Sequence, residues 1–499
     1  MRVRMCFQHW YVCEAVDCGR CSSKALGTVS NAGKSVASPW AVRSGTLSPA
    51  FHLGIENGTV VTPRGRRRAH IYVSEGKVAA VTSDRQSADE VANADGLLVL
   101  PGMVDSHVHL MDPVAQERED FPTGTAAAAR AGVTSLIEHT HLGPVRGSAD
   151  LRAKIDYLRD RSRIDFALAA HSWPDETESA AEAWQSGAAF IKAFMSTSHG
   201  VPAHNASQLQ QLFSRASSCG AVCLVHCEED SITAEAERSL RRAHRLDGAV
   251  IFEWRTREAE LIATSTAALL ARKTGARVVI AHASSPEVVA VAAQQKAQRA
   301  RLWVESCPQY FTLFEHESIQ FGALRKFTPP ARARSEAELD QMWRLLSDGQ
   351  IDLVSSDHAP STKAQKEEGS IWEAHFGLPG IDTTMSVLLD GAHKGAISYE
   401  RVVEVYSERP AMLYGLYPAK GRLGVGADAD IVLVDPESRW LVNDADILSK
   451  AGWSPFSGRT LFGRAVATYL RGMLVASDGQ VLAKPGTGRF LPGLGAQVS

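Results

Sequence analysis

The sequence predicts an α/β fold in which a (β/α)8 barrel of the TIM type carries a small β-sandwich formed from both chain ends. The barrel is predicted because eight short apolar runs alternate with Ala-rich helical stretches, and polar residues stand at the carboxyl end of nearly every run. The sandwich is predicted because β-rich segments with Gly-containing turns precede and follow this alternation. An open, doubly wound sheet is the alternative topology, and the polar strand ends favour the barrel.

Length and charge narrow the classes of partner. The 499 residues suit one barrel with a smaller appended domain, and the net charge of -3 gives no reason to expect a nucleic acid or an anionic membrane as partner. No apolar run approaches the ~20 residues that cross a bilayer. We therefore expect a small-molecule partner.

The cysteines beyond residue 200 lie in apolar contexts typical of reduced core residues, so we expect a cytoplasmic protein.

The predicted elements follow in order along the chain. Residues 1–50 lack periodicity and are expected to form a disordered extension, while 51–100 and 415–485 are expected to form the sandwich around a barrel at 101–414. The predicted barrel strands are the runs 97–110, 133–139, 165–171, 188–195, 221–228, 277–282, 301–307 and 351–358. The predicted helices are 123–131, 149–161, 176–185, 207–219, 256–274, 286–300 and 334–348, with an eighth near 382–394.

Residue types that bind metals or move protons stand at the ends of these strands. They are His107, His109, His139, His171, Lys192, His226, His282, Asp357 and His358. The carboxyl ends of barrel strands meet on one face, so side chains far apart in the sequence can converge there. A single histidine at a strand end is usually structural. Five strands that end in ligand types at the same depth predict a metal site.

Four of these residues carry specific expectations. His107 and His109 stand at i and i+2 of a strand, so both side chains point the same way and can hold one ion. Lys192 lies among apolar residues, where burial lowers the pKa of a lysine; its amine could form a carbamate that bridges two ions, or the side chain could extend to the barrel rim. Asp357 can bind metal and transfer the proton of activated water.

At this point the sequence resembles a known family. The set Asp105-Ser-His107-Val-His109, Lys192, His226, His282 and Asp357 resembles the amidohydrolase superfamily, in its cyclic amidase branch of dihydroorotases, hydantoinases and allantoinases. Further motifs are similar to that branch in the same order: FPTGT at 121–125, ESCPQY at 305–310, TPP at 328–330 and GWSPFSGR at 452–459. The resemblance covers roughly residues 52–485.

The resemblance implies a barrel with a sandwich, and two divalent ions, of which zinc is the expected metal. His107, His109 and Asp357 would hold one ion, His226 and His282 the other, and N6-carboxylated Lys192 would bridge them. A hydroxide bridging the ions would open a cyclic amide, with Asp357 as the catalytic residue that passes the proton to the leaving nitrogen. The groups expected to bind substrate are Ser306, Pro329 and Thr197. The resemblance also implies a homo-oligomer, either a dimer or a tetramer.

The expected substrate follows from departures within the branch. Dihydroorotases bind a substrate carboxylate through an arginine and an asparagine, where this chain has Met111 and His139-Thr-His141. Hydantoinases carry a tyrosine at the position of Thr197, and allantoinases share the threonine. The motifs are most similar to those of allantoinases, so we expect hydrolysis of allantoin to allantoate.

Two residues, Glu229 and Gln309, depart from the allantoinase pattern. Hydrolysis of hydantoins or dihydropyrimidines is therefore the alternative, and dihydroorotase activity is less favoured. A non-enzymatic scaffold of the same fold is disfavoured because all six ligand positions are filled. In each enzymatic case the partner is a small cyclic ureide or imide.

Overall fold

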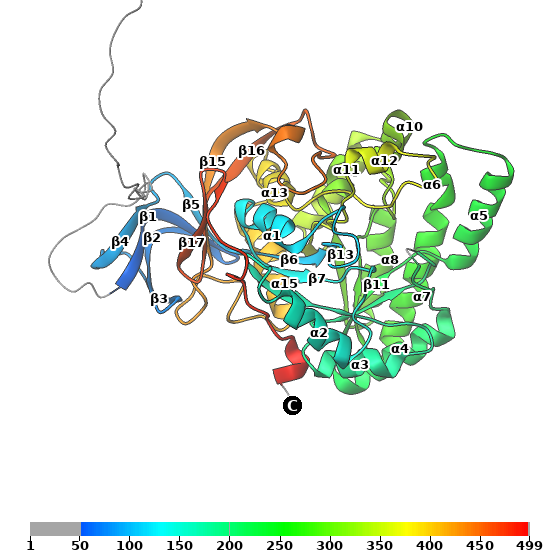
Figure 1. Cartoon of the computed structure of the whole chain (residues 1–499), viewed down its shortest axis with the longest axis horizontal. Helices are drawn as coiled ribbons and strands as arrows, with labels where there is room; N and C mark the ends of the chain where they lie inside the picture. Colours follow the sequence, from blue (N-terminus) through cyan, green and yellow to red (C-terminus); the bar gives the residue numbers. More distant parts are fainter. Residues whose placement is uncertain (1–50, 199, 498–499) are drawn as a thin grey trace, which may run out of the picture. The chain divides into compact units, whose positions relative to one another are not determined.

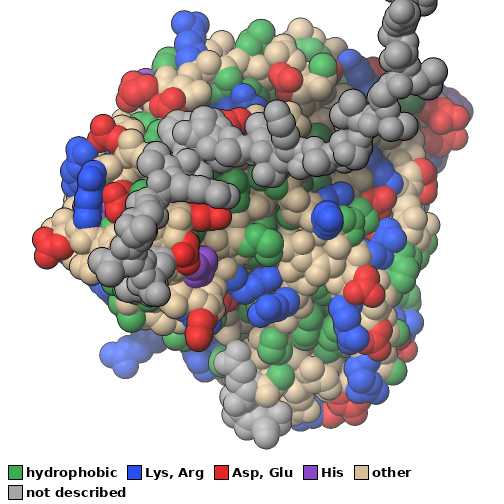
Figure 2. Space-filling model, turned by 60° about the vertical axis from the view of Figure 1, so that its left-hand side comes forward, with side chains coloured by type: hydrophobic (Ala, Val, Ile, Leu, Met, Phe, Trp, Pro, Cys, Tyr) green, Lys and Arg blue, Asp and Glu red, His purple; other side chains and the backbone are tan. Residues whose placement is uncertain are grey.

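The computed structural model describes residues 51–198 and 200–497, so the expectation for residues 1–50 lies outside the described residues. The described strands form three sheets (Figure 1). Among the described helices, none is both long enough and apolar enough to span a bilayer. On the visible face in Figure 2, acidic and basic side chains are interspersed, as the small net charge suggests.

Strands from both ends of the described chain form one nine-stranded sheet. Its order is β18-β17-β16-β15-β5-β1-β2-β3, with β4 paired to β1. The strands are β1 (Phe51–Thr62), β2 (Gly65–Ser74), β3 (Lys77–Thr82), β4 (Ala88–Asn93), β5 (Leu98–Pro101), β15 (Ile431–Leu441), β16 (Thr460–Leu470), β17 (Met473–Ser477) and β18 (Gln480–Val481). β5 joins the two groups, because it pairs with β1 in parallel and with β15 in antiparallel fashion. In Figure 1 the blue strands β1 and β2 accordingly share a sheet with the orange and red strands β15 to β17.

The predicted barrel strands form two parallel arcs. The first contains β6 (Met103–Val108), β7 (Val133–Glu138) and β8 (Asp165–Leu168). The second contains β9 (Ala170–His171), β10 (Ile191–Phe194), β11 (Val222–His226), β12 (Arg277–Ile280), β13 (Leu302–Ser306) and β14 (Leu353–Val354). The predictions of single strands over 97–110 and 165–171 were wrong. The second run is divided into β8 and β9, which belong to different sheets. Gly102 separates β5 from β6, and a side chain there would collide with Thr134, since a Cβ would lie 2.0 Å from its Oγ1.

Hydrogen bonds and apolar packing link the two arcs. Ala189 N donates to Leu168 O (2.8 Å) at one junction, and His109 N donates to His358 O (2.7 Å) at the other. Both arcs also send side chains into one buried cluster, whose members include Ile137, Ala167, Phe190, Leu224, Val279, Leu353 and Tyr414. Successive residues of a strand point to opposite faces, so the residues two positions after Phe190 and Leu224 point the same way as these cluster members.

Helices alternate with the parallel strands and lie outside them (Figure 1). The eight predicted helices are confirmed within a few residues: α1 (Phe121–Arg130), α2 (Ser148–Leu158), α3 (Thr177–Gln185), α4 (Ala206–Cys219), α7 (Arg257–Thr274), α8 (Pro286–Ala297), α11 (Glu336–Ser347) and α13 (Thr384–His393). Further helices were not predicted: α5 (Asp230–Arg242), α6 (Val250–Trp254), α9 (Pro308–Thr312), α10 (Glu317–Phe321), α12 (Lys363–Glu367), α14 (Tyr399–Val403) and α15 (Arg409–Leu413). In α5 only Thr233 is buried, so the helix has no apolar stripe by which its sequence could be recognised.

Candidate metal centre

The six predicted metal ligands line one cavity at the carboxyl ends of the parallel strands. Its lining comprises His107, His109, His141, Lys192, Phe194, His226, His282, Thr328, Asp357, Ala359, Phe376 and Gly377. The alternation along each strand explains the convergence: Lys192 follows Phe190 by two residues on β10, and His226 follows Leu224 by two on β11. Five of the six ligands are at least nine-tenths buried; Asp357 is partly exposed.

His107 of β6 and His109, which follows this strand directly, face one carboxylate. Asp357 Oδ1 lies 3.2 Å from His107 Nε2 and 3.5 Å from His109 Nε2. The opposite ring nitrogens have acceptors: His107 Nδ1 contacts Glu305 Oε1 at 2.7 Å, and His109 Nδ1 contacts His139 O at 3.1 Å. A proton on each Nδ1 leaves both Nε2 lone pairs directed at the Asp357 side, which is the arrangement that metal-binding histidines adopt.

A second pair of histidines faces each other across the cavity wall. His226 Nδ1 lies 3.0 Å from His282 Nε2, while His226 Nε2 contacts Glu228 Oε2 at 2.7 Å. Among the described residues, His282 Nδ1 has no hydrogen-bond partner. Glu228 fixes the tautomer of His226 and leaves a lone pair on its Nδ1, which points at His282 Nε2. An ion between these two nitrogens would take both lone pairs.

Glu228 is held in its charged form. Burial raises the pKa of this carboxyl, but Arg255, His226 and Thr328 together outweigh burial and lower the pKa to about 2. Thr328 Oγ1 donates to Glu228 Oε2 at 2.6 Å, and Arg255 Nη1 lies 3.3 Å from the same oxygen. An ionised Glu228 can therefore accept the Nε2 proton of His226 throughout the neutral range.

Lys192 stays inside the cavity wall instead of extending to the rim. Its side chain is 1% exposed, and its Nζ lies 5.1 Å from the centre of the Phe194 ring. Burial lowers the pKa of Lys192 to about 8, although Asp357 and Glu305 act in the opposite direction. A larger fraction of neutral amine is thus present near neutral pH than in an ordinary lysine, and only the neutral amine can react with carbon dioxide.

Two residues of the centre have a positive φ angle, which residues other than glycine rarely adopt. The φ angle is 48° at Asp357 and 38° at His282. Asp105 holds the turn before Asp357, because its Oδ1 accepts from Ser356 N (3.0 Å) and its Oδ2 from Tyr406 OH (3.0 Å). The first residue of the Asp-Ser-His-Val-His motif thus positions the residue that closes the site.

The three predicted substrate-binding residues lie elsewhere in the described structure. Thr197 is exposed, and its N donates to Asp230 Oδ1 (2.6 Å). Ser306 Oγ donates to Ala283 O (2.8 Å), and Pro329 O accepts from Tyr310 OH (2.8 Å). None of the three is among the described residues that line the cavity of the centre. Their contact with substrate stays a prediction.

Sequence reasoning missed the role of two residues that matter to this geometry, Glu305 and Glu228, which orient His107 and His226. His139, named in the sequence as a strand-end candidate, lies with its ring centre 4.4 Å from that of His107. Glu305 appeared only as part of a motif, although it follows Trp303 by two residues on β13 and so shares its inward face. The same alternation was available as a signal in the sequence.

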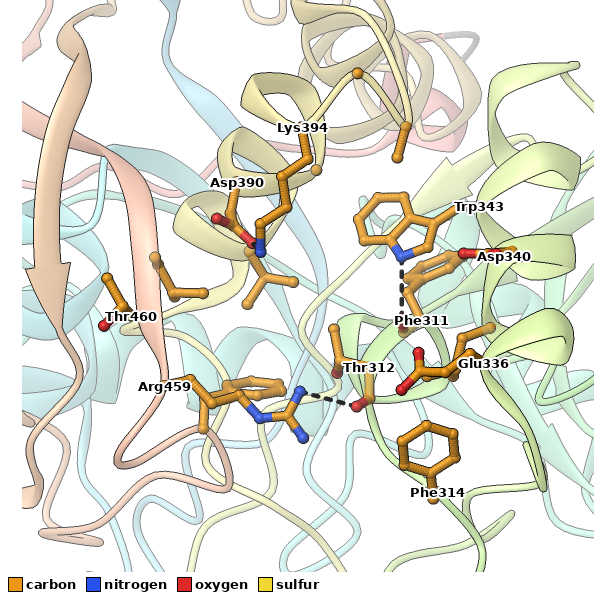
Figure 3. Close-up of a pocket in the computed structure, with 17 residues that line it drawn as sticks. Phe311, Thr312, Phe314, Glu336, Asp340, Trp343, Asp390, Lys394, Arg459 and Thr460 are labelled. Atoms are coloured by element: carbon orange, nitrogen blue, oxygen red, sulfur yellow. Dashed lines mark hydrogen bonds and ion pairs between the residues drawn. The ribbon is translucent and has the colours of Figure 1, made fainter.

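A larger cavity lies away from this centre (Figure 3). It has a volume of about 810 Å³ and lies between α9, α11, α13 and the region before β16. Trp343 Nε1 donates to Phe311 O (3.0 Å), and Arg459 Nη1 donates to Thr312 O (2.9 Å) along its wall. It contains none of the predicted ligands, so cavity size does not identify the reaction site here.

Comparison with known proteins agrees with the geometry. Residues 98–453 match the model of the amidohydrolase family. The chain is 32% identical over 453 residues to an L-hydantoinase of Paenarthrobacter aurescens, covering 88% of this chain and 98% of the relative. It is 33% identical over 450 residues to an allantoinase of Rubrobacter xylanophilus, covering 89% of this chain and 98% of the relative.

Solved structures are similar over the same range. An L-hydantoinase (dihydropyrimidinase) from Arthrobacter aurescens superposes with a TM-score of 0.85 at 32% identity, covering 89% of this chain and 100% of that chain. A dihydropyrimidinase from Brevibacillus agri gives a TM-score of 0.82 at 30% identity, covering 88% of this chain and 98% of that chain. Family model, relatives and structures agree: the chain belongs to the amidohydrolase family and is a hydrolase of cyclic amides.

Proposed function

We propose that this chain is a metal-dependent hydrolase of cyclic ureides that opens allantoin to allantoate. One observation carries the proposal: all six ligand side chains line a single cavity, and acceptors outside it hold the other ring nitrogens of His107, His109 and His226. The threonine at 197 and the allantoinase relatives support allantoin as substrate. Hydantoins or dihydropyrimidines are the second candidate, which the L-hydantoinase relative supports.

The proposed architecture is a closed (β/α)8 barrel at 101–414 with a sandwich from 51–100 and 415–485. The hydrogen bonds and the shared apolar cluster between the two arcs support closure. In this arrangement His107, His109 and Asp357 would hold one divalent ion, His226 and His282 would hold the other, and carboxylated Lys192 would contribute a ligand to both. Bound zinc would supply a water of lowered pKa and would polarise the ring carbonyl.

Asp357 moves the proton in the proposed reaction. Its Oδ1 stands 3.2 and 3.5 Å from the Nε2 atoms of His107 and His109, which supports a place beside the proposed ion and its water. The carboxylate takes the proton from water and passes it to the leaving ring nitrogen. Phe376 and Gly377 line the same cavity beside Asp357.

The substrate is tested by incubating the zinc-loaded protein with allantoin, hydantoin, dihydrouracil and dihydroorotate in parallel, and measuring each ring-opened acid. Turnover of allantoin alone supports the first candidate. Opening of hydantoin or dihydrouracil without allantoin replaces it with the second.

The role of Asp357 is tested by Asp357→Asn. Loss of a general acid–base group lowers turnover by roughly 10²- to 10⁴-fold. We expect this loss together with retained zinc, measured by elemental analysis of the same sample. Normal turnover by a zinc-containing Asp357→Asn variant contradicts the assignment.

A further inference from the structure

We propose that His139 is a further metal ligand, at the end of the centre formed by His107 and His109. The inference rests on the proposed metal centre and goes beyond its six ligands. His139 follows β7 directly, so it enters the site from a strand that contributes none of those six. The three histidines each offer a ring nitrogen, and these three atoms lie within 4.8 Å of one another.

The His139 ring is buried without satisfying its polar atoms. It is 1% exposed, and neither Nδ1 nor Nε2 has a hydrogen-bond partner among the described residues. Burying a polar group without a partner costs free energy comparable to a lost hydrogen bond, so unpartnered buried groups need an explanation. By contrast, the buried His204 has partners for both nitrogens, in Phe194 O and Ser172 Oγ.

The backbone holds His139 firmly in this position. His139 N donates to Val108 O (3.1 Å), and His139 O contacts both His109 Nδ1 (3.1 Å) and His171 Nε2 (2.8 Å). The Phe190 ring packs against the imidazole, with ring centres 5.2 Å apart and planes at 73°. Since Phe190 offers no polar partner on its side, the hydrogen-bonding capacity of His139 is left for the side where His107 and His109 lie.

On that side, the ring centre of His139 lies 4.4 Å from His107 and 4.5 Å from His109. An ion between the three rings would take a lone pair of His139 that otherwise has no partner, which is the missing explanation for the burial of this ring. Three imidazoles on one ion also favour zinc, cobalt, nickel or copper over magnesium and manganese, which prefer oxygen ligands. The proposed ligand thus narrows the class of metal.

The test is zinc affinity of the full-length protein, measured by competition with a chromophoric chelator. His139→Leu keeps the site apolar and removes both nitrogens, and His204→Leu is the matched control at a buried histidine with its own partners. Loss of an orienting partner alone weakens metal binding ~10- to 100-fold, so loss of a ligand should weaken one of the two ions by at least that factor. The control should stay within about twofold, well below that range.

A second measurement needs no variant. In a crystal structure of the zinc-loaded wild type, a His139 nitrogen should stand about 2.0–2.1 Å from an ion. The proposal is overturned if His139→Leu binds both ions as the wild type does, or if water separates the ring from the metal. A wild type that binds no divalent ion overturns the metal centre itself, and with it the proposed function.

Discussion

Two buried carboxylates decide which nitrogen the histidines of the centre present to the cavity. Glu305 takes His107 Nδ1 and Glu228 takes His226 Nε2, so the two rings expose different atoms, Nε2 and Nδ1. The sequence predicted the ligand residues from their places at strand ends. It could not predict this pairing, because Glu305 stands 198 residues from His107 and its role depends on how the two arcs meet in space. The left-handed backbone conformation of His282 and Asp357 could not be predicted from the sequence either, since neither residue type requires it.

Replacing Glu305 tests the orienting role. Glu305→Gln keeps the shape but weakens the acceptor, and we expect zinc affinity to fall roughly 10- to 100-fold with the fold intact. Chelator competition measures the affinity, and circular dichroism checks the fold. Glu260→Gln is the matched control, because Glu260 is equally buried but contacts Ser284 and Arg332 instead of a histidine. Equal affinities in the two variants would contradict the assignment.

The lowered pKa of Glu228 predicts that the free energy of unfolding falls at acidic pH. Its pKa is lowered from 4.5 to about 2 because Arg255, His226 and Thr328 outweigh burial, so the folded state binds its proton more weakly than the unfolded state. The resulting stabilisation is present above pH 4.5 and is lost as the pH falls from about 4.5 towards 2. Urea unfolding of the metal-free protein across this range should show a flatter pH dependence for Glu228→Gln. An unchanged slope would assign this fall to other carboxyls.

At the scale of elements, two buried lysines tie the loop after β14 to the segment before Thr328. Lys326 Nζ donates to Ile371 O (2.6 Å), Trp372 O (3.2 Å) and Ala374 O (2.6 Å). Lys366 Nζ donates in turn to Lys326 O (2.8 Å) and His375 O (2.7 Å). This loop carries Phe376 and Gly377 of the cavity wall, so the lysines hold the wall in place. Sequence patterns predict helices and strands, whereas a loop held by side chains has no period to detect.

Removing one lysine should loosen this loop. Lys366→Met removes the donor of His375 O and one of the two donors of Lys326 O, which keeps its bond from Gly377 N. An unsatisfied buried group costs ~1–3 kcal/mol. We expect faster amide exchange and proteolysis within residues 361–380 than in the wild type, measured by hydrogen exchange and limited digestion. Lys394→Met serves as the control, because Lys394 is largely exposed and contacts only its helix neighbour Asp390 in the structure. The assignment fails if the loop is protected equally in both variants.

For the molecule as a whole, one buried lysine joins the large sheet to the first arc. Lys420 Nζ lies 2.5 Å from Asp165 Oδ2 of β8, and 2.9 and 2.8 Å from Asp428 and Asp430 Oδ2 just before β15. The alternation of elements predicted both parts of the fold. Their attachment depends on an ion cluster whose members are scattered along the chain, so it emerged only from the structure.

The cluster predicts a large stability loss in Lys420→Met. Breaking a buried ion pair by removing one partner costs ~3–5 kcal/mol. In Lys420→Met the buried Asp430 loses its counter-charge, while Asp165 keeps Arg471 and Asp428 keeps Lys77. Urea unfolding should show this loss, while Lys394→Met, which removes the exposed partner of an i,i+4 pair with Asp390, should cost only about 0.5 kcal/mol. Similar losses in the two variants would show that the cluster is not needed for the attachment.

The shared nine-stranded sheet also has a consequence for biosynthesis. β5 receives its second neighbour only when Ile431 to Val434 pair with Leu98 to Pro101, so one edge of the early strands stays open until most of the chain has left the ribosome. Pairings this distant in sequence form slowly, and an open apolar strand edge is prone to aggregate in the meantime. The yield of folded protein should therefore depend on how quickly the last hundred residues arrive, more than on the stability of the finished molecule.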